Sequence, residues 1–262
     1  MDEETGKYRA PALDKGLDIL EFLAASPEGL TKVEIAKGLG RTANEIYRML
    51  STLERRNYVT SSPGGDKFML SLKLLMLANA HPPRRRLLDI AEPLMRQFTQ
   101  KSEQSSHLAL WEDGNVVISS SMSAPGNWRL ALRPGATVGM YNTGSGFVLV
   151  AFQPDQTRKR MIGEHHLVKG EDRIPDAAFL KTLDHVKEVG FSRGASQTLT
   201  GVINLSFPIL DPSGCAIAAF TCPYIERIDD YDAPRLEDVI AMAGEAAQQI
   251  GRQVSGRFLG LR

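Results

Sequence analysis

Two helix-start signals follow each other closely near the N-terminus, and they constrain the fold more than any other feature of the sequence. Thr31 is followed three residues later by Glu34, and Thr42 is followed in the same way by Glu45. In each pair the threonine side chain can accept the backbone N–H of the glutamate while the glutamate accepts the backbone N–H of the threonine, which starts a helix. The sequence Gly38-Leu39-Gly40 separates the two helices. The segment therefore predicts a helix-turn-helix.

A further helix precedes this pair, and a β-hairpin follows it. Apolar residues recur at helical spacing over residues 11–24, which predicts the preceding helix. The strand-like segments 58–61 and 67–70 flank the glycine-rich turn 62–66. Three helices followed by a hairpin are the elements of a winged helix-turn-helix.

The outward face of the third helix carries side chains that suit the major groove of DNA. The whole chain has no formal net charge, but residues 29–73 hold eight basic and four acidic side chains. An amide can read adenine, a guanidinium can bind guanine or phosphate, and a helix N-terminus attracts phosphate. Helix-turn-helix shapes also serve protein–protein contacts, so both interpretations stay open at this point. The candidate DNA-binding residues are Thr31, Lys32, Arg41, Thr42, Ala43, Asn44, Tyr47, Arg48, Ser51, Arg55 and Lys67.

A second part of mixed helices and strands follows the break at His81-Pro82-Pro83. A helix is predicted over 84–101, and the strand pair 107–111 and 116–119 is predicted to form a hairpin. The strand pair 202–210 and 215–223 is predicted to form another, with Leu210 opposite Cys215. The helices 175–189 and 234–254 are predicted to pack on the resulting sheet, and the apolar stripe of the second is either core or a dimer seam.

The last hairpin has a predicted register, because its turn 211–214 is short. Pairing directly across this turn makes Ser206 face Ala219 and Asn204 face Thr221. Since side chains alternate along a strand, Asn204, Ser206 and Thr221 then share one polar face of an apolar sheet. Such a face suits the wall of a ligand site.

A glycine-rich loop over 133–146 precedes a short apolar segment, 147–152, which is predicted to be a helix. Thr143 and Ser145 are both candidates for its N-cap. The N-terminus of this helix could bind a carboxylate through backbone amides, because the neighbouring glycines allow close approach. The alternative is a glycine-rich connector that binds no ligand.

The search for catalytic and metal-binding motifs returns little. The sequence has no nucleophile elbow, no phosphate-binding glycine loop with its lysine, and no paired-histidine helix. His165 and His166 are adjacent, so they are interpreted as solvated loop residues rather than metal ligands. His107, His185 and Ser145 form no recognisable catalytic set by sequence, although the fold could bring them together. We expect no catalytic residue, no metal and no cofactor.

The two cysteines, Cys215 and Cys222, lie in one apolar strand-like run, where their spacing does not permit a disulfide. The sequence also lacks the apolar stretch of a secretory signal or a membrane span. We therefore expect a cytoplasmic protein with no membrane partner.

Several blocks resemble one family of bacterial regulators. Residues 12–20, 29–31 and 46–59 resemble the DNA-binding domain of the IclR family, residues 72–77 resemble its linker helix, and residues 190–223 resemble the second half of its effector domain. The resemblance implies a GAF-like C-terminal domain that binds a small organic molecule, assembly as dimers or dimers of dimers, and effector-dependent binding to double-stranded operator DNA. The resemblance does not indicate whether the protein represses or activates transcription.

The resemblance also indicates which residues contact the effector. Many family members carry an acidic residue where Gly194 stands and a cysteine where Asn204 stands, so the identity of the ligand stays open. Trp128, Tyr141 and Asn204 with Thr221 suit a larger or aromatic acid better than a two- or three-carbon acid, and a core position is an equally open interpretation of Trp128. The candidate effector-binding residues are Trp128, Gly139, Met140, Tyr141, Asn142, Thr143, Gly144, Ser145, Gly194, Asn204, Ser206, Thr221 and Pro223.

These inferences combine into an α+β protein. The predicted architecture is an N-terminal winged helix-turn-helix over 1–70, a linker helix over 71–83, and a GAF-like effector-binding and oligomerisation domain with an antiparallel sheet over 84–262. The expected function is ligand-responsive transcriptional regulation, and the expected partners are operator DNA, a small carboxylate-containing or aromatic effector and further copies of the chain. The alternative is a metabolite-binding enzyme or sensor whose helix-turn-helix serves protein contacts.

Overall fold

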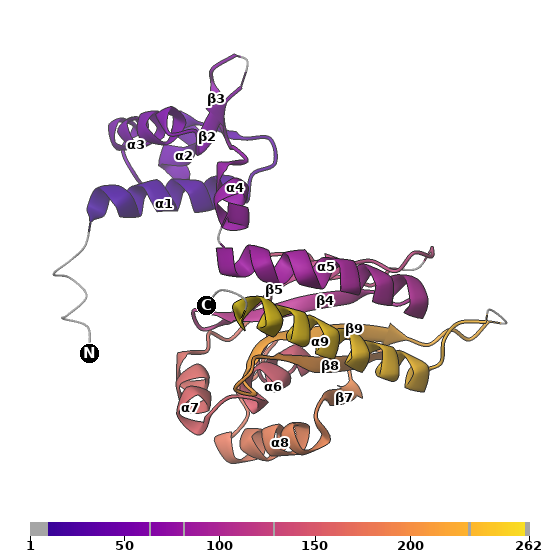
Figure 1. Cartoon of the computed structure of the whole chain (residues 1–262). Coiled ribbons are helices and arrows are strands. Elements are labelled where there is room, and N and C mark those ends of the chain that lie inside the picture. Colours follow the sequence, from indigo (N-terminus) through magenta and orange to yellow (C-terminus); the bar gives the residue numbers. More distant parts are fainter. Residues whose placement is uncertain (1–9, 63, 81, 128, 230–231, 260–262) are drawn as a thin grey trace. The chain divides into compact units, whose positions relative to one another are not determined.

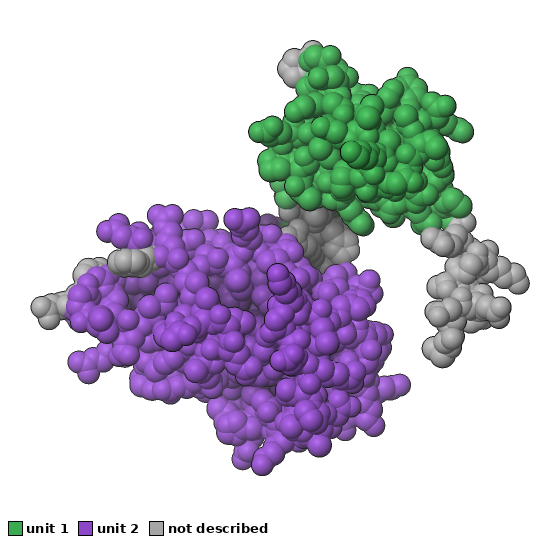
Figure 2. All heavy atoms as spheres, turned by 180° about the vertical axis from the view of Figure 1, so that it is seen from behind, with its two compact units in different colours: residues 1–85 green, residues 86–262 purple. Residues whose placement is uncertain are grey.

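The computed structural model describes residues 10–62, 64–80, 82–127, 129–229 and 232–259. The chain divides into two compact units between Arg85 and Arg86 (Figure 2). None of the described helices is long and apolar enough to cross a membrane.

The first unit has the predicted order of three helices and a hairpin, followed by a short helix (Figure 1). Its elements are α1 (Pro11–Ala24), β1 (Leu30–Thr31), α2 (Lys32–Gly38), α3 (Ala43–Arg55), β2 (Val59–Ser61), β3 (Lys67–Leu70) and α4 (Lys73–Ala80). The three strands form an antiparallel sheet in the order β1-β3-β2. Both predicted capping boxes are formed, since the hydroxyls of Thr31 and Thr42 accept the backbone N–H of Glu34 and Glu45. Local sequence signals thus place both helix starts.

The core of this unit fixes which side of α3 faces outward. Ile46 and Leu50 of α3 are each 1% exposed and pack with α1 and α2. Lys15 of α1 forms an ion pair with Glu45 (2.5 Å between Nζ and Oε1), and this contact, together with hydrogen bonds from Thr42, lowers the pKa of Glu45 to about 2. Because its apolar side is buried, α3 presents its polar side to solvent.

The second unit is a six-stranded antiparallel sheet between two layers of helices (Figure 1). In chain order its elements are α5 (Pro82–Ser102), β4 (Ser106–Glu112), β5 (Asn115–Met122), β6 (Thr137–Val138), α6 (Gly144–Ala151), α7 (Asp155–Glu164), α8 (Asp176–Val189), β7 (Ser192–Ala195), β8 (Val202–Leu210), β9 (Ala216–Ile225) and α9 (Leu236–Leu259). The strands lie in the order β6-β5-β4-β9-β8-β7. This mixture of helices and an antiparallel sheet confirms the predicted fold class.

Each face of the sheet has its own hydrophobic core. On one face, α5 and α9 pack against apolar side chains of β8 and β9, with Met95, Phe220 and Val239 fully buried. On the other face, α6, α7 and α8 pack against β4, β5 and β9. The α7 helix is absent from the predictions, because its largely polar sequence shows no apolar stripe.

The register of the β8–β9 hairpin differs by two residues from the predicted one. Leu210 pairs with Ala216 rather than with Cys215, because Asp211 Oδ1 accepts the N–H groups of Ser213 and Cys215 and so lengthens the turn by one residue. An irregularity between Ile209 and Leu210 adds a second residue.

The shift changes the partners but not the faces. Ser206 lies opposite Thr221, and Asn204 lies opposite Pro223, instead of Ala219 and Thr221 as predicted. Because side chains alternate with a period of two, an even shift keeps Ser206 and Thr221 on the same face.

Candidate functional site

The outward face of α3 carries the side chains that sequence reasoning placed there. Asn44, Tyr47, Arg48, Ser51 and Arg55 are all exposed, and Tyr47 is 57% exposed. Ala43, at the N-terminal end of the helix, is exposed as well. The face is therefore open to a partner within its own unit and combines amide, hydroxyl, phenol and guanidinium groups.

Other candidate DNA-binding residues have contacts inside the unit. The hydroxyls of Thr31 and Thr42 serve as helix caps, and Arg41 forms an ion pair with Asp18 (3.3 Å between Nη2 and Oδ2). The ammonium group of Lys32 lies over the ring of Tyr47, 5.1 Å from its centroid. Lys67 begins strand β3 of the wing and is half-buried. The contacts of Arg41, Thr42 and Lys32 orient the turn and the start of α2 relative to α1 and α3.

A cavity of about 360 Å³ opens in the second unit at the N-terminal end of α6. Its walls come from the segment before α6, the segment after α7, strands β4, β8 and β9, and the segment after β7. The lining residues are His107, Leu130, Leu132, Thr137, Val138, Gly139, Asn142, Thr143, Gly144, Ser145, Val168, Lys169, Ser196, Thr198, Leu199, Val202, Asn204, Thr221 and Pro223. A mostly apolar concavity with a few convergent polar groups is typical of a small-molecule site.

Most of the candidate effector-binding residues lie on this wall. Those that line it are Gly139, Asn142, Thr143, Gly144, Ser145, Asn204, Thr221 and Pro223. Met140 and Tyr141 do not, because their side chains point into the core, where Tyr141 packs edge-on against Phe179. Gly194 lies on the exposed edge strand β7, Ser206 is fully buried beneath Gly144, and Trp128 lies outside the described residues.

Close packing of glycines brings the N-terminus of α6 to the cavity. Thr143 caps this helix by accepting the N–H of Gly146 (3.1 Å), which decides between the two predicted caps. A Cβ on Gly146 would lie 2.4 Å from the carbonyl oxygen of Met140, and a Cβ on Gly144 would lie 2.4 Å from Oγ of Ser206. Only glycines therefore allow α6 to sit against the loop and the sheet in this way.

A buried polar row lies at the floor of the cavity, and three of its four members, His107, Ser145 and Thr221, line the cavity. His107, Thr221 and Ser206 are neighbours across β4, β9 and β8, and Ser145 of α6 lies above them. The hydroxyl of Thr221 donates to Ser206 (2.8 Å), so Ser145 donates to Thr221 (2.9 Å). Ser145 can then accept from Nε2 of His107, at 3.4 Å.

Burial keeps His107 neutral, because desolvation lowers its pKa to about 4. Of the histidines weighed with Ser145, the fold brings His107 to it and leaves His185 exposed on α8. Sequence reasoning did not place His107 in the site, and only the pairing of β4 with β9 shows it there.

The segment after α7 also differs from its interpretation as a solvated loop. The side chain of His165 is 1% exposed and lies 3.0 Å from Oε2 of Glu171, whereas His166 is exposed. Val168 and Lys169 of this segment line the cavity, and neither was a candidate. Among the described lining residues, Lys169 carries the only formal charge.

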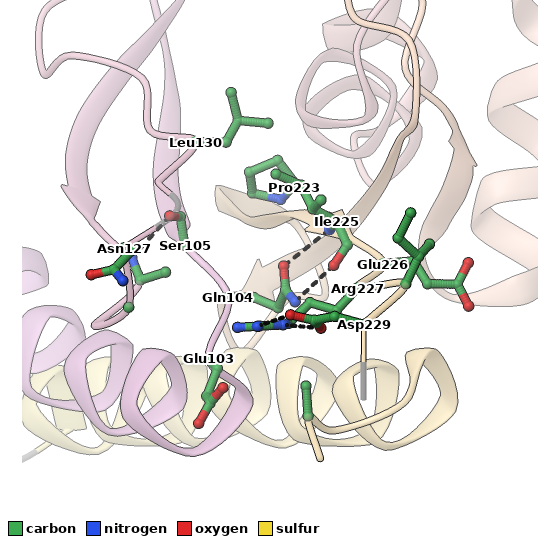
Figure 3. Close-up of a pocket in the computed structure, with 14 residues that line it drawn as sticks. Glu103, Gln104, Ser105, Asn127, Leu130, Pro223, Ile225, Glu226, Arg227 and Asp229 are labelled. Carbon is green, nitrogen blue, oxygen red and sulfur yellow. Dashed lines mark hydrogen bonds and ion pairs between the residues drawn. The ribbon is translucent and has the colours of Figure 1, made fainter. Parts of the chain in front are cut away.

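A second hollow, of about 290 Å³, adjoins the first and shares Leu130 and Pro223 with it (Figure 3). Here the side-chain amide of Gln104 bonds to both backbone groups of Ile225 (3.1 and 3.0 Å), and Arg227 pairs with Asp229. The Gln104 amide is therefore satisfied by the backbone, and Arg227 and Asp229 satisfy each other. We therefore place the candidate effector site in the first cavity, where a helix N-terminus, an amide and an ammonium group converge.

Comparisons with known families match both units. A family model described as the IclR helix-turn-helix domain matches residues 12–63, and one described as the bacterial transcriptional regulator IclR C-terminal matches residues 83–252.

Curated relatives span nearly the whole chain. The HTH-type transcriptional regulator KdgR of Escherichia coli K12 is 26% identical over 243 residues, covering 92% of this chain and 91% of the relative. The HTH-type transcriptional regulator BhcR of Paracoccus denitrificans is 27% identical over 252 residues, covering 95% and 88%.

Solved structures share the fold. An IclR homolog from Microbacterium hydrocarbonoxydans, crystallised with 4-hydroxybenzoate, has a TM-score of 0.77 at 18% identity and covers 94% of this chain and 99% of that one. A regulator from Alicyclobacillus acidocaldarius has a TM-score of 0.73 at 22% identity and covers 95% and 99%.

Proposed function

Because the chain belongs to the IclR family of bacterial transcriptional regulators, we propose that it binds operator DNA through the exposed face of α3 and that a small organic acid in the α6 cavity modulates this binding. It is a helix-turn-helix regulator with an effector-binding C-terminal domain. One observation supports the proposal most directly: the same chain has an exposed polar face on α3 in its first unit and a ligand-sized cavity in its second.

The DNA part of the proposal rests on the side chains of α3. Asn44 and Arg48 supply the amide and guanidinium that recognise purine edges in the major groove, and Arg55 is placed further along the helix for a phosphate. The capped start of α3 leaves backbone N–H groups that attract phosphate. Lys67 on the wing supports a backbone contact that positions the unit without reading sequence.

The effector part rests on the charges and polar groups of the cavity wall. Lys169 and the N-terminus of α6 both favour an anion, while His107 is neutral and contributes no charge. Leu130, Leu132 and Val202 supply apolar surface for the body of the ligand. An aromatic or branched carboxylate fits this combination, and the 4-hydroxybenzoate bound to the Microbacterium homolog is a suitable first probe.

We further propose that the chain acts as an oligomer in the cytoplasm and not as an enzyme. The relatives reported above are transcriptional regulators, which supports a role in regulation. Helix α4 and the residue before it expose large apolar side chains that a second copy of the chain would cover; those more than half exposed are Leu75 and Met76 on α4 and Leu72 directly before it.

The test of the proposal is DNA binding by the full chain. Fluorescence anisotropy with DNA from the region upstream of its own gene should give saturable binding that weakens as salt rises, and 4-hydroxybenzoate or related acids should shift the affinity. Arg48→Ala should weaken binding by about tenfold or more, since a base or phosphate contact is worth about 1–3 kcal/mol. Arg160→Ala, which removes an exposed arginine from α7, is the matched control and should bind like the wild type. Equal affinity of Arg48→Ala and the control would contradict the assigned reading face.

A further inference from the structure

We propose that the buried pair of Glu171 and His165 is the tie that positions both loops around the effector cavity, and that effector exchange requires this tie to open. The proposal deepens the proposed function and rests on it for the identity of the ligand. The two loops are the segment before α6, residues 139–143, and the segment after α7, residues 165–171.

The carboxylate of Glu171 joins the two loops directly. Its Oε1 accepts the backbone N–H of Tyr141 at 2.7 Å, across to the first loop, and its Oε2 accepts the backbone N–H of Val168 at 3.0 Å, within the second. The Glu171 side chain is fully buried. Two backbone donors on one buried carboxylate fix the relative position of the segments that carry them.

His165 completes the environment of this carboxylate. Its Nε2 lies 3.1 and 3.0 Å from the two oxygens of Glu171, and its Nδ1 lies 3.0 Å from the carbonyl oxygen of Gly114 in the β4–β5 turn. A carbonyl oxygen only accepts, so Nδ1 carries a proton. The backbone of His166 donates to the same carbonyl (2.9 Å). The tie is therefore anchored to the end of a rigid hairpin.

The charges of the pair balance. With Nδ1 protonated, one further proton is shared between Nε2 of His165 and Glu171, so the pair is neutral as a whole and its buried groups are hydrogen-bonded. Replacing Glu171 or His165 alone leaves a buried donor or acceptor without its partner. Burying such an unpaired group costs far more free energy than burying the intact pair.

Both loops held by this pair line the cavity. Gly139, Asn142 and Thr143 lie on the first loop, and Val168 and Lys169 lie on the second. The amide of Asn142 also donates to the carbonyl oxygen of Gly170 (3.4 Å), which is a weaker bridge between the same loops. A change at Glu171 thus reaches the ligand through the backbone, although Glu171 is not among the lining residues.

Gly139 offers a second, independent way to displace the tie. A Cβ at this position would lie 2.7 Å from Cδ and 2.8 Å from Oε1 of Glu171, and 2.0 Å from Oδ1 of Asn142. The carboxylate and the amide could not both keep their places beside an alanine. Gly139→Ala therefore pushes on Glu171 without changing its chemistry.

The first experiment measures amide hydrogen exchange in the full chain without ligand, comparing the wild type with Glu171→Gln. The amide places an NH₂ group against one of the two backbone donors, so protection of the peptide that contains this donor, Tyr141 or Val168, should fall by about tenfold or more, while β8 and β9 keep theirs. Asp172→Asn, at the exposed neighbouring carboxylate, is the matched control and should leave exchange unchanged.

Unchanged protection at Tyr141 and Val168 would overturn the proposal, and so would an equal loss throughout β8 and β9, which would mark a purely structural role. If Glu171→Gln does not fold, Gly139→Ala decides in the same assay. Gly163→Ala is its control, since a Cβ there meets nothing within 4 Å.

The second experiment measures dissociation of 4-hydroxybenzoate by stopped-flow fluorescence. Glu171→Gln should release it about tenfold faster than Asp172→Asn, with ligand-free operator affinity unchanged. Equal release rates would overturn the link between the tie and ligand exchange. If the wild type binds none of this acid, the proposed choice of effector fails, while the exchange measurement still decides the positioning role.

Discussion

His107 shows how one buried side chain can couple a ligand site to pH. It is one of the few titratable side chains among the described residues that is almost entirely buried, and desolvation lowers its pKa to about 4. An unfolded chain exposes the same imidazole, which then titrates near its ordinary value of about 6.5. Between these two values the unfolded chain binds a proton that the folded chain does not.

This difference predicts how stability depends on pH. Above about pH 6.5, His107 is neutral in both states and the free energy of unfolding is at its full value. As the pH is lowered towards 4, the unfolded chain takes up a proton first, so the free energy of unfolding should fall by an amount on the order of 3 kcal/mol. His107→Gln keeps an amide near Ser145 but cannot titrate, so its free energy of unfolding should fall less than that of the wild type between about pH 6.5 and 4. Urea unfolding of both proteins at pH 7, 5.5 and 4 measures the difference. His185→Gln, at an exposed site, should follow the wild type; parallel curves for His107→Gln and the wild type would contradict the prediction.

Sequence reasoning reached some residues of the site and missed others for a physical reason. Asn204 and Thr221 were found because alternation along a strand fixes the face on which a side chain lies. Strand pairing brings His107 to the cavity, and a loop crossing brings Lys169 to it and Glu171 behind its wall; no local pattern encodes either arrangement. Tyr141 was placed in the site because it lies in the right loop, but burial turned its side chain into the core.

At the scale of elements, the helices were predictable where their ends and faces carry local signals. The starts of α2 and α3 follow from their capping boxes, and α1 follows from its apolar spacing. The β8–β9 register was predicted two residues away from its position, because the hydrogen bonds of Asp211 and an irregularity near Leu210 act only in the folded hairpin. Local chemistry fixes helix boundaries, whereas strand register depends on tertiary contacts.

Helix α4 differs from the other helices of its unit in the surface it leaves open. Leu75 and Met76 of α4 are 56% and 64% exposed, Leu72 directly before the helix is 73% exposed, and Leu13 on α1 is 62% exposed. Isolated exposed apolar residues are ordinary, but several on one short helix mark a contact surface. A second copy of the same helix is the occupant we propose, since symmetric dimers bury the same surface on both chains.

Leu75→Ser should therefore weaken self-association while the chain stays folded. Because Leu75 is 56% exposed, covering it contributes roughly half of the 1.5–3 kcal/mol of a fully buried leucine, and a two-fold axis counts the substitution twice, so the dimer dissociation constant should rise by about tenfold or more. Sedimentation velocity over a range of concentrations measures this constant. Ile228→Ser removes a fully exposed apolar residue from the second unit and should leave this dissociation constant unchanged. An unaltered constant in Leu75→Ser would place the self-association surface elsewhere.

At the scale of the whole molecule, the two activities belong to different units of one chain, so their coupling is a thermodynamic quantity. If an acid in the cavity changes operator affinity by some factor, the operator must change the affinity for the acid by the same factor. This reciprocity holds whatever rearrangement connects the units. It also separates variants that damage one site from variants that damage the coupling.

Asn204→Ala and Arg48→Ala test this separation. Asn204 lines the cavity and Arg48 lies on the exposed face of α3, so each substitution removes a contact at one site only. Asn204→Ala should weaken binding of 4-hydroxybenzoate by about tenfold, through the loss of a hydrogen bond, and leave ligand-free operator affinity intact. Arg48→Ala should weaken operator binding and keep the thermal stabilisation that the acid gives to the protein.

Calorimetric titration of the acid with and without operator, beside operator titrations with and without the acid, should give one common coupling factor for the wild type. Two different factors would show that a third equilibrium, such as self-association through α4, changes during the titration, and repeating the measurement with Leu75→Ser would test this cause.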